Sequence, residues 1–250
     1  PHSPYVCPEK YARMYEGLGL NKDAVAYYGM ISNIDDNLGT LLARLKDWDL
    51  ERNTLLIFMT DNGHPLGALY NAGMRGTKGT PYQGGTRVPS FWRWPGVLPA
   101  GVDVDRLAAH IDLFPTFAEL AQATYDKAPQ PDGRSLVPLL EDPAAEWPDR
   151  NVFVHVGRWE QGKAAESKFA HCAVRNNRFR LVNNSELFDI KADPGEKTNV
   201  IAQHADIVAA MRRAYDDWWD EILPCLENEN VIGPKVNPYK ELYWKQFGKE

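Results

Sequence analysis

Two oxygen-bearing side chains, Asp61 and Asn62, follow a short apolar segment and could bind a hard metal ion. Carboxylate and amide oxygens suit Mg²⁺ and Ca²⁺, and Ca²⁺ takes about six to eight oxygen ligands. Two residues cannot complete such a shell. The same residues also describe an ordinary turn, in which Asn62 and Gly63 supply the backbone conformation. From the tetrapeptide Thr60 to Gly63 alone, a metal site and a structural turn both remain open.

A lysine in a glycine-dense segment is the second group with possible chemistry. Lys78 lies within residues 64–86, where small residues let backbone and ammonium groups approach an anion closely. A lysine is a compact point charge that suits a tetrahedral oxyanion. The alternative is a solvated surface lysine, the commonest environment of this residue type. Arg87 follows two glycines and could also bind an anion, but we expect it to pair with a carboxylate.

The segments around these residues predict an α/β fold. Apolar residues recur at spacings of three and four up to Trp48, which predicts an amphipathic helix with Asn21 or Asp23 as its N-cap. Residues 54–59 form a continuous apolar run, typical of a strand covered on both faces. A helix followed by such a strand is half of a βαβ unit, and ligands bind beyond the carboxyl ends of strands in open α/β sheets.

Further strands and helices are expected downstream. We predict a strand at residues 87–94, a short strand at 107–111, and a helix from 112 to 123 capped by Asp112. The segments 151–156, 168–175, 178–183 and 186–190 predict a small antiparallel sheet. The pair Asn176-Asn177 is expected to form a tight hairpin turn, because asparagine accepts a positive φ. A helix at 199–221 follows, and residues 233–250 show no clear periodicity.

Composition bounds the possible partners. The 250 residues are 44% hydrophobic, which is enough for a substantial core. The net charge of -6 comes without a basic stripe, which argues against nucleic acid as the main partner. No apolar run approaches the roughly 20 residues that span a bilayer, so no membrane partner is expected. Any anionic substrate must therefore be held by a few cations placed in a cleft.

Taken in order, several segments of this chain closely resemble consecutive blocks of sulfatases. Each block alone is weak, but the ordered series runs over nearly the whole chain and is specific. The blocks are Asn33-Ile34-Asp35-Asp36-Asn37-Leu38-Gly39, Thr60-Asp61-Asn62-Gly63, Lys78 to Pro89, Arg93-Trp94-Pro95-Gly96, Ile111 to Thr116, Glu186 to Ile190 and Asp193-Pro194-Gly195-Glu196.

The resemblance implies an α/β fold: part of an alkaline-phosphatase-like layered domain, followed by a small antiparallel sheet with a C-terminal helix. Residues 1–125 would be the C-terminal part of the catalytic domain, 126–150 a linker, and 151–250 a small α+β subdomain. The implied activity is that of a sulfuric ester hydrolase, acting on a small-molecule or carbohydrate sulfate ester. Family membership would also place the protein in the periplasm or outside the cell, although the residues themselves do not decide the compartment.

The same resemblance assigns roles to single residues. Asp61 and Asn62 would be two ligands of a divalent cation, usually Ca²⁺ with Mg²⁺ as the alternative, and Lys78 would contact the sulfate group. His2, in Pro1-His2-Ser3-Pro4, matches a family segment whose histidine can protonate the leaving group. Trp159 lies where it could stack on a sugar ring of the substrate.

Two features depart from the family pattern. Gln83 stands where many relatives have glutamate. The family's nucleophile is a formylglycine made from Cys or Ser in a Cys/Ser-x-Pro-x-Arg motif, and no Cys or Ser of this chain is followed by that pattern. The first metal-binding Asp pair of the family also lies further upstream, and Asp35-Asp36 is assigned no metal. The chain starts at Pro1 without a methionine, so we expect a missing N-terminal half that supplies these groups, and we expect the chain alone to be inactive.

Two alternative functions remain open on these grounds. One is a phosphonate monoester or phosphodiester hydrolase of the same fold, because phosphate and sulfate groups have similar shapes. The other is a catalytically inactive homologue that binds sulfated glycans. Among the remaining histidines, His64 could support the metal ligands from behind. The others are expected to be structural or exposed: His110, His171 and His204.

Overall fold

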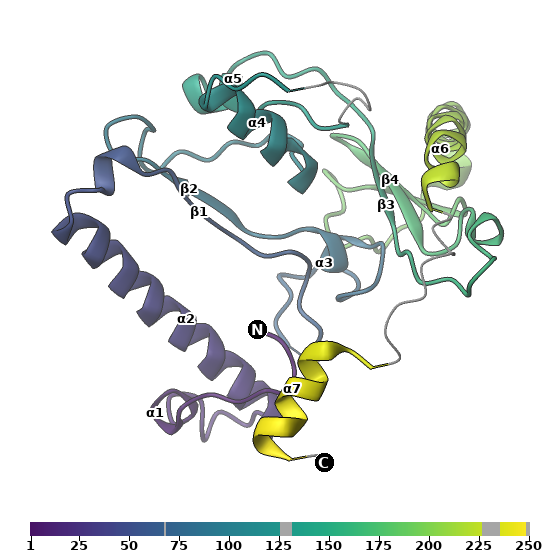
Figure 1. Cartoon of the computed structure of the whole chain (residues 1–250). Coiled ribbons are helices and arrows are strands. Elements are labelled where there is room, and N and C mark those ends of the chain that lie inside the picture. The colour runs from purple at the N-terminus through teal and green to yellow at the C-terminus, as the bar shows by residue number, and fades with distance from the viewer. Residues whose placement is uncertain (68, 126–131, 227–235, 249–250) are drawn as a thin grey trace.

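The chain folds into two parts that meet at one short helix (Figure 1). The computed structural model describes residues 1–67, 69–125, 132–226 and 236–248. The first part contains a long helix, a two-stranded hairpin and small helices above it. The second part is a four-stranded sheet with a helix on one face. Between them lies α3 (Gln83–Thr86). This arrangement confirms the predicted α/β class with a small antiparallel sheet.

The first part begins with α1 (Glu9–Ala12) and the long helix α2 (Lys22–Asp47). The side chain of Asn21 accepts a hydrogen bond of 2.8 Å from the backbone amide of Ala24, which confirms the predicted N-cap. Tyr11 and Tyr27 are buried where α1 packs on α2. A satisfied cap and a buried aromatic contact thus fix the N-terminal end of the helix.

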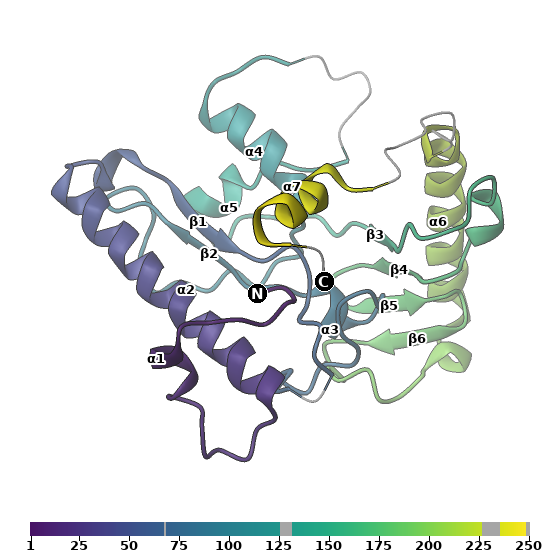
Figure 2. The same ribbon diagram turned by 60° about the horizontal axis from the view of Figure 1, so that its bottom comes forward.

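A 3₁₀ turn (Glu51–Asn53) leads into β1 (Leu56–Met59), which pairs antiparallel with β2 (Ser90–Arg93). Both strands were expected, but the expectation that β1 is covered on both faces is wrong in the part of the chain that the structure describes. All four β1 residues are half-buried, and β2 is their partner. The reason is that α2 diverges from the hairpin instead of packing on it (Figures 1 and 2).

The predicted strand at residues 107–111 is wrong. A 3₁₀ turn (His110–Asp112) stands there and leads directly into α4 (Leu113–Leu120). The carboxylate of Asp112 accepts a hydrogen bond of 2.8 Å from the amide of Ala109, which draws the chain into a turn. Asp112 therefore caps the turn before α4 rather than α4 itself.

The stretch expected to be a linker, residues 126–150, is partly fastened to the first part, and residues 126–131 of it lie outside the described ranges. Asp112 also accepts from the amide of Arg134 at 2.8 Å and forms an ion pair with Arg150 in which both side chains are buried. Between these contacts lies α5 (Val137–Glu141). The domain boundaries themselves stay a prediction.

The second part is an antiparallel sheet in the order β3 (Val152–His155), β4 (Cys172–Arg175), β5 (Phe179–Val182) and β6 (Glu186–Asp189). A 3₁₀ turn (Ala165–Ser167) precedes β4, and another (Ile201–Gln203) precedes α6 (Ala205–Leu226). Helix α6 covers one face of the sheet (Figure 2). Its buried side chains form the main core with that face: Val208, Met211, Tyr215 and Trp219.

Two asparagine pairs close the hairpins of this sheet in different ways. Asn176 does not take the predicted positive φ; its side-chain oxygen accepts from the amides of Arg178 and Phe179 at 3.0 and 2.7 Å. The positive φ values fall on Asn183 and Asn184, at 49° and 57°. The second pair therefore forms the left-handed turn, and the first works through a side-chain hydrogen bond.

A final helix, α7 (Pro238–Phe247), was not expected from periodicity. Asn237 caps it by accepting from the amide of Tyr239 at 2.9 Å, and proline stands at its first position. Both are ordinary helix-start signals. Of the helices that the structure describes, none has the length and apolar character to cross a membrane.

Candidate active site

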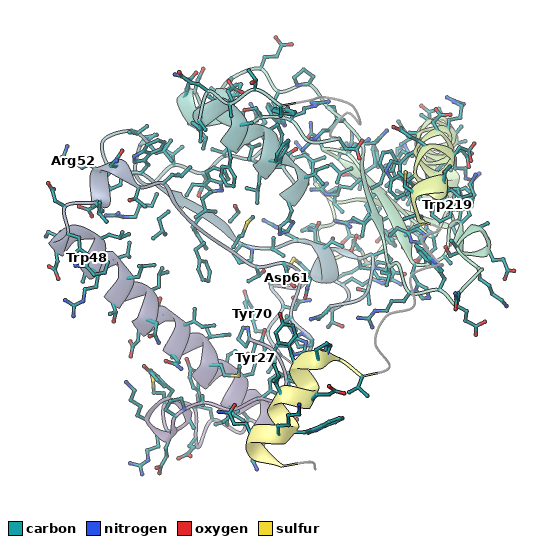
Figure 3. All side chains as sticks on the ribbon, in the orientation of Figure 1. Tyr27, Trp48, Arg52, Asp61, Tyr70 and Trp219 are labelled. Carbon is teal, nitrogen blue, oxygen red and sulfur yellow. The ribbon has the colours of Figure 1, made fainter. Side chains whose placement is uncertain are left out.

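The candidate metal ligands lie in the turn that follows β1. Thr60 Oγ1 donates to the backbone oxygen of Asn62 at 3.2 Å, and His110 Nε2 lies 2.8 Å from the backbone oxygen of Thr60. Asp61 is exposed and Asn62 is half-buried. Neither side chain makes a hydrogen bond or ion pair with the residues that the structure describes. Figure 3 shows Asp61 beside α3, at the junction of the two parts. The backbone of the turn is fixed, while its side-chain oxygens are available to a ligand.

The lysine segment packs directly against this turn. The amide of Gly63 donates to the backbone oxygen of Gly85 at 3.0 Å. The amide of Lys78 donates to the backbone oxygen of His64, also at 3.0 Å. A Cβ atom on Gly63 would lie 1.8 Å from the backbone oxygen of Gly84. Only glycine permits this approach, so the two segments meet backbone to backbone.

Two glycines shape the backbone around Lys78. This residue stands between Gly76 and Gly79, whose φ values of +80° and +83° turn the chain sharply on either side. The side chain is half-buried, and its ammonium group forms no ion pair within the described ranges. An unpaired, partly desolvated cation attracts an anion more strongly than a fully solvated one. The structure thus brings Asp61, Asn62 and Lys78 onto adjoining backbone segments.

A ladder of aromatic rings joins the N-terminal segment to the same region. Tyr5 packs on Tyr27 with ring centroids 5.7 Å apart, and Tyr27 packs on His64 at 6.5 Å. Both ring nitrogens of His64 are buried without a hydrogen-bond partner in the part of the chain that the structure describes. This imidazole can therefore accept or donate a hydrogen bond to a further group.

His2 lies on this N-terminal segment but contacts none of the other candidates. It is exposed, and its Nδ1 lies 2.8 Å from the backbone oxygen of Ser3. In Figures 1 and 2 the N-terminal end lies beside the segment that leaves β1. The role of His2 as an acid stays a prediction.

Trp159 lies in the loop after β3 (Val152–His155). Its ring packs on His155 at 5.6 Å, and His155 also packs on Trp219 at 4.9 Å. Burial lowers the pKa of His155, whose Nε2 lies 3.1 Å from the backbone oxygen of Ser167. Trp159 is half-buried, so part of its ring is accessible. Sugar stacking by this residue stays a prediction.

Other candidates take structural positions. Gln83 is 3% exposed, so the departure from the family's glutamate lies inside the protein. Arg87 is exposed and does not form the expected ion pair with any described carboxylate. Asp36 accepts a hydrogen bond of 2.8 Å from the hydroxyl of Tyr11, which agrees with a pairing role. His204 packs on Phe179 with ring centroids 5.1 Å apart.

Two buried charged residues were missed at the level of sequence. Arg180 and Glu196 are 2% and 1% exposed, and both contact the segment around α3. Glu196 ends the block Asp193-Pro194-Gly195-Glu196, which was a signal for it. Arg180 lies between apolar neighbours on β5. Because side chains alternate along a strand, this pattern predicts that Arg180 faces solvent.

The donors fit a hard cation in kind but not in number. Asp61 and Asn62 offer two free oxygen ligands, where Ca²⁺ takes about six to eight. Within the described ranges, no group of three or more His, Cys, Asp or Glu side chains could hold a metal ion. These two residues can form one side of a cation site, and other groups must complete it.

Comparison with known families agrees with this geometry. The family model described as "Sulfatase" matches residues 1–123, and the model "N-sulphoglucosamine sulphohydrolase, C-terminal" matches residues 77–218. A sulfatase of Formosa agariphila is 31% identical over 199 residues, which cover 71% of this chain and 35% of the relative. Human arylsulfatase A is 33% identical over 194 residues, covering 68% and 38%.

Solved structures show the same fold. The crystal structure of Ps i-CgsB in complex with k-i-k-neocarrahexaose superposes with a TM-score of 0.76 at 27% identity. The match covers 98% of this chain and 52% of that protein. The chain thus spans about a third to a half of the relatives it matches.

Proposed function

Because the chain belongs to the sulfatase family, we propose that a protein containing it hydrolyses a sulfate ester and that this chain forms one wall of the active site. The observation that carries the proposal is the direct contact between the Asp61-Asn62 turn and the Lys78 segment. Two hydrogen bonds of 3.0 Å join them, from Gly63 to Gly85 and from Lys78 to His64. The Asp61-Asn62 turn and the Lys78 segment, whose side chains form no ion pair with the described residues, are therefore joined through their backbones.

Each residue has a chemical task in this proposal. Asp61 and Asn62 would hold a divalent cation, which we propose to be Ca²⁺, and the cation would offset negative charge on the sulfate oxygens. Lys78 donates a charged hydrogen bond to the sulfate group and stabilises the charge that builds up on it during the reaction. His2 donates a proton to the oxygen of the departing alcohol. The nucleophile, a formylglycine, comes from a segment outside this chain.

We further propose that the N-terminal half of the same protein is the partner that completes the site. Apolar side chains of the hairpin and α4 surround a groove: Leu55, Ile57, Trp94, Phe117, Leu120 and Ala121. Phe91 on β2 is 65% exposed, and Ile31 and Leu41 on α2 are 41% and 45% exposed. An apolar groove, with further exposed apolar side chains on the same part of the chain, marks an interaction site. A chain that spans half of its relatives leaves enough of them to cover it.

The substrate that we propose is a carbohydrate sulfate ester. Ps i-CgsB, which shares this fold, was crystallised with k-i-k-neocarrahexaose. Trp159 supports the proposal because its ring is held on edge by His155 and is only half-buried. Aromatic rings held in this way stack on the apolar faces of sugars.

The test is turnover by the protein that joins this chain to its N-terminal half. An aryl sulfate and an aryl phosphonate with the same leaving group should be compared under the same conditions. The proposal expects a higher kcat/KM for the sulfate. A higher value for the phosphonate would favour the phosphonate hydrolase alternative. Binding of a sulfated glycan without turnover of either ester would favour the inactive homologue.

A further inference from the structure

A buried ion pair ties the small sheet to the segment that follows Lys78. Arg180 on β5 and Glu196 after β6 have side chains that are 3% and 0% exposed, with Nε and Oε1 3.0 Å apart. The neighbours of Arg180 on the strand, Phe179 and Leu181, pack in the core beneath α6. Because side chains alternate along a strand, Arg180 points to the opposite face. That face receives α3.

The guanidinium of Arg180 holds both ends of α3. Its Nη1 donates to the backbone oxygen of Pro81 at 2.8 Å and to Oγ1 of Thr86 at 2.9 Å. Its Nη2 donates to Oε1 of Gln83 at 3.4 Å. A planar fork that reaches three acceptors on one segment restricts both position and orientation, which a lysine could not do.

Glu196 also holds this segment. Its Oε2 accepts a hydrogen bond of 2.7 Å from the amide of Gln83, the first residue of α3. Gln83 is uncharged, so it adds an acceptor for Arg180 without placing a second negative charge beside Glu196. Gln83, which replaces the family's glutamate, therefore lies in the buried contact with Arg180 and Glu196.

Arg75 adds a second, outer contact between the same two parts. Its guanidinium lies 4.0 Å from the ring centre of Tyr82 and donates to Glu186 at 3.2 Å and to the backbone oxygen of Glu196 at 3.4 Å. The amide of Gly84 donates to the backbone oxygen of Arg75 at 2.7 Å. The segment before α3 is thus also fastened to the sheet.

The ion pair is costly as a source of stability alone. Burial raises the pKa of Glu196 and lowers the pKa of Arg180 to about 10, so the protein environment disfavours both charges. Buried ion pairs are often no more stabilising than apolar residues of similar size. Their contacts with α3 point instead to a geometric task.

Helix α3 contacts both this ion pair and the turn Thr60 to Gly63. Glu196 bonds to the amide of Gln83, and two residues later the backbone oxygen of Gly85 accepts from the amide of Gly63. We propose that Arg180 and Glu196 are positioning residues, which fix α3 so that the Asp61-Asn62 turn and the Lys78 segment keep their mutual placement. The reaction served by this placement rests on the proposed sulfatase function.

The test is amide hydrogen exchange in the full 250-residue chain. Arg180→Met is compared with Arg178→Met, a change of the same type on the same hairpin. Arg178 pairs with Asp189 at 2.7 Å and is 60% exposed, and it makes no contact with α3. The amides of Gly63 and Lys78 report on the site, and the amide of Ile190, bonded to the backbone oxygen of Arg178 at 2.9 Å, reports on the sheet.

The proposal expects Arg180→Met to speed exchange at Gly63 and Lys78 by about tenfold while Ile190 changes little. Arg178→Met should leave the two site amides as in the wild type. Unchanged exchange at Gly63 and Lys78, or an equal increase at all three amides, would overturn the proposal. If Arg180→Met does not fold, Arg180→Lys is used instead, because it keeps the positive charge without the planar guanidinium. The same exchange results at Gly63, Lys78 and Ile190 then support or overturn the proposal.

Turnover provides the second readout and separates the two proposals. In the protein completed by the N-terminal half, Arg180→Met should lower kcat/KM for an aryl sulfate by about tenfold, and Arg178→Met by less than about twofold. Faster local exchange in a protein that turns over no sulfate ester would refute the proposed function and leave the positioning role standing. Wild-type turnover in Arg180→Met would overturn the positioning role.

Discussion

Replacing Gly63 by alanine tests the contact on which the site depends. Gly63 links the turn Thr60 to Gly63 to α3. A Cβ atom at Gly63 would lie 1.8 Å from the backbone oxygen of Gly84 and 2.8 Å from the carbonyl carbon of Gly84. Real Cβ atoms do not approach other atoms below about 3 Å, because interiors are already close-packed. The neighbours are backbone atoms, so no side chain can rotate away. The two segments must therefore separate by more than about 1 Å.

The energetic cost follows from that separation. The hydrogen bond from Gly63 to Gly85 is 3.0 Å long, and an added 1 Å takes it beyond hydrogen-bonding range. Loss of this bond costs about 1 kcal/mol, and overpacking costs about 1–3 kcal/mol more. We expect Gly63→Ala to lower the free energy of unfolding by about 3 kcal/mol, or the Tm by about 6–12 °C.

Urea and thermal unfolding followed by circular dichroism measure this change. Gly39→Ala is the matched control, because a Cβ at Gly39 in α2 meets nothing within 4 Å. There alanine should leave stability unchanged or raise it by up to about 1 kcal/mol, since alanine is the better helix former. If Gly63→Ala unfolds within about 0.5 kcal/mol of the wild type, the close approach of the two segments is wrong.

Three further predictions concern charge, pH and metal. Arg150→Leu leaves the fully buried carboxylate of Asp112 unpaired, so chemical denaturation should show a loss of about 3–5 kcal/mol, and a loss below 1 would contradict the buried pair. Because burial lowers the pKa of His155, the folded state favours the neutral ring. The stability that this lowered pKa contributes is present above the unfolded pKa near 6.5 and is lost as pH falls below that value. His155→Phe should therefore flatten the fall in the free energy of unfolding between pH 7.5 and 5.5. An unchanged slope would refute that reading. Calorimetry should show that the 250-residue chain alone binds Ca²⁺ weakly, with a Kd of about 10⁻³ M or higher, because it supplies two ligands; micromolar binding would contradict this.

Features with a local cause could be predicted from the sequence. Helix α2 follows from apolar spacing and the Asn21 cap, and the strands of the small sheet follow from short apolar segments between turns. The turn Thr60 to Gly63 and the Lys78 segment were selected by residue type and by order along the chain, and the structure shows that they are hydrogen-bonded to each other. The sequence could not show that Asn183 takes the positive φ while Asn176 works through a side-chain hydrogen bond. Both asparagine pairs have the same local chemistry.

Features that depend on distant partners could not be predicted. Arg180 and Pro81 are 99 residues apart, and Gln83 and Glu196 are 113 residues apart. No local sequence pattern therefore predicts either contact. The turn at 110–112 forms because Asp112 bonds to Ala109, whereas the apolar residues there suggested a strand. The half-buried state of β1 likewise depends on what packs against it, which its own apolar residues do not reveal.

We propose that Lys78 acts on a sulfate group beside the Asp61-Asn62 turn. The most direct measurement is kcat/KM for an aryl sulfate in the protein completed by its N-terminal half, for the wild type and Lys78→Ala, with the exposed Lys191→Ala as control. We expect kcat/KM to fall by about 10²–10³ in Lys78→Ala and to stay unchanged in Lys191→Ala, because only Lys78→Ala removes a charged donor to the developing negative charge. Equal activity of Lys78→Ala and the wild type would contradict it.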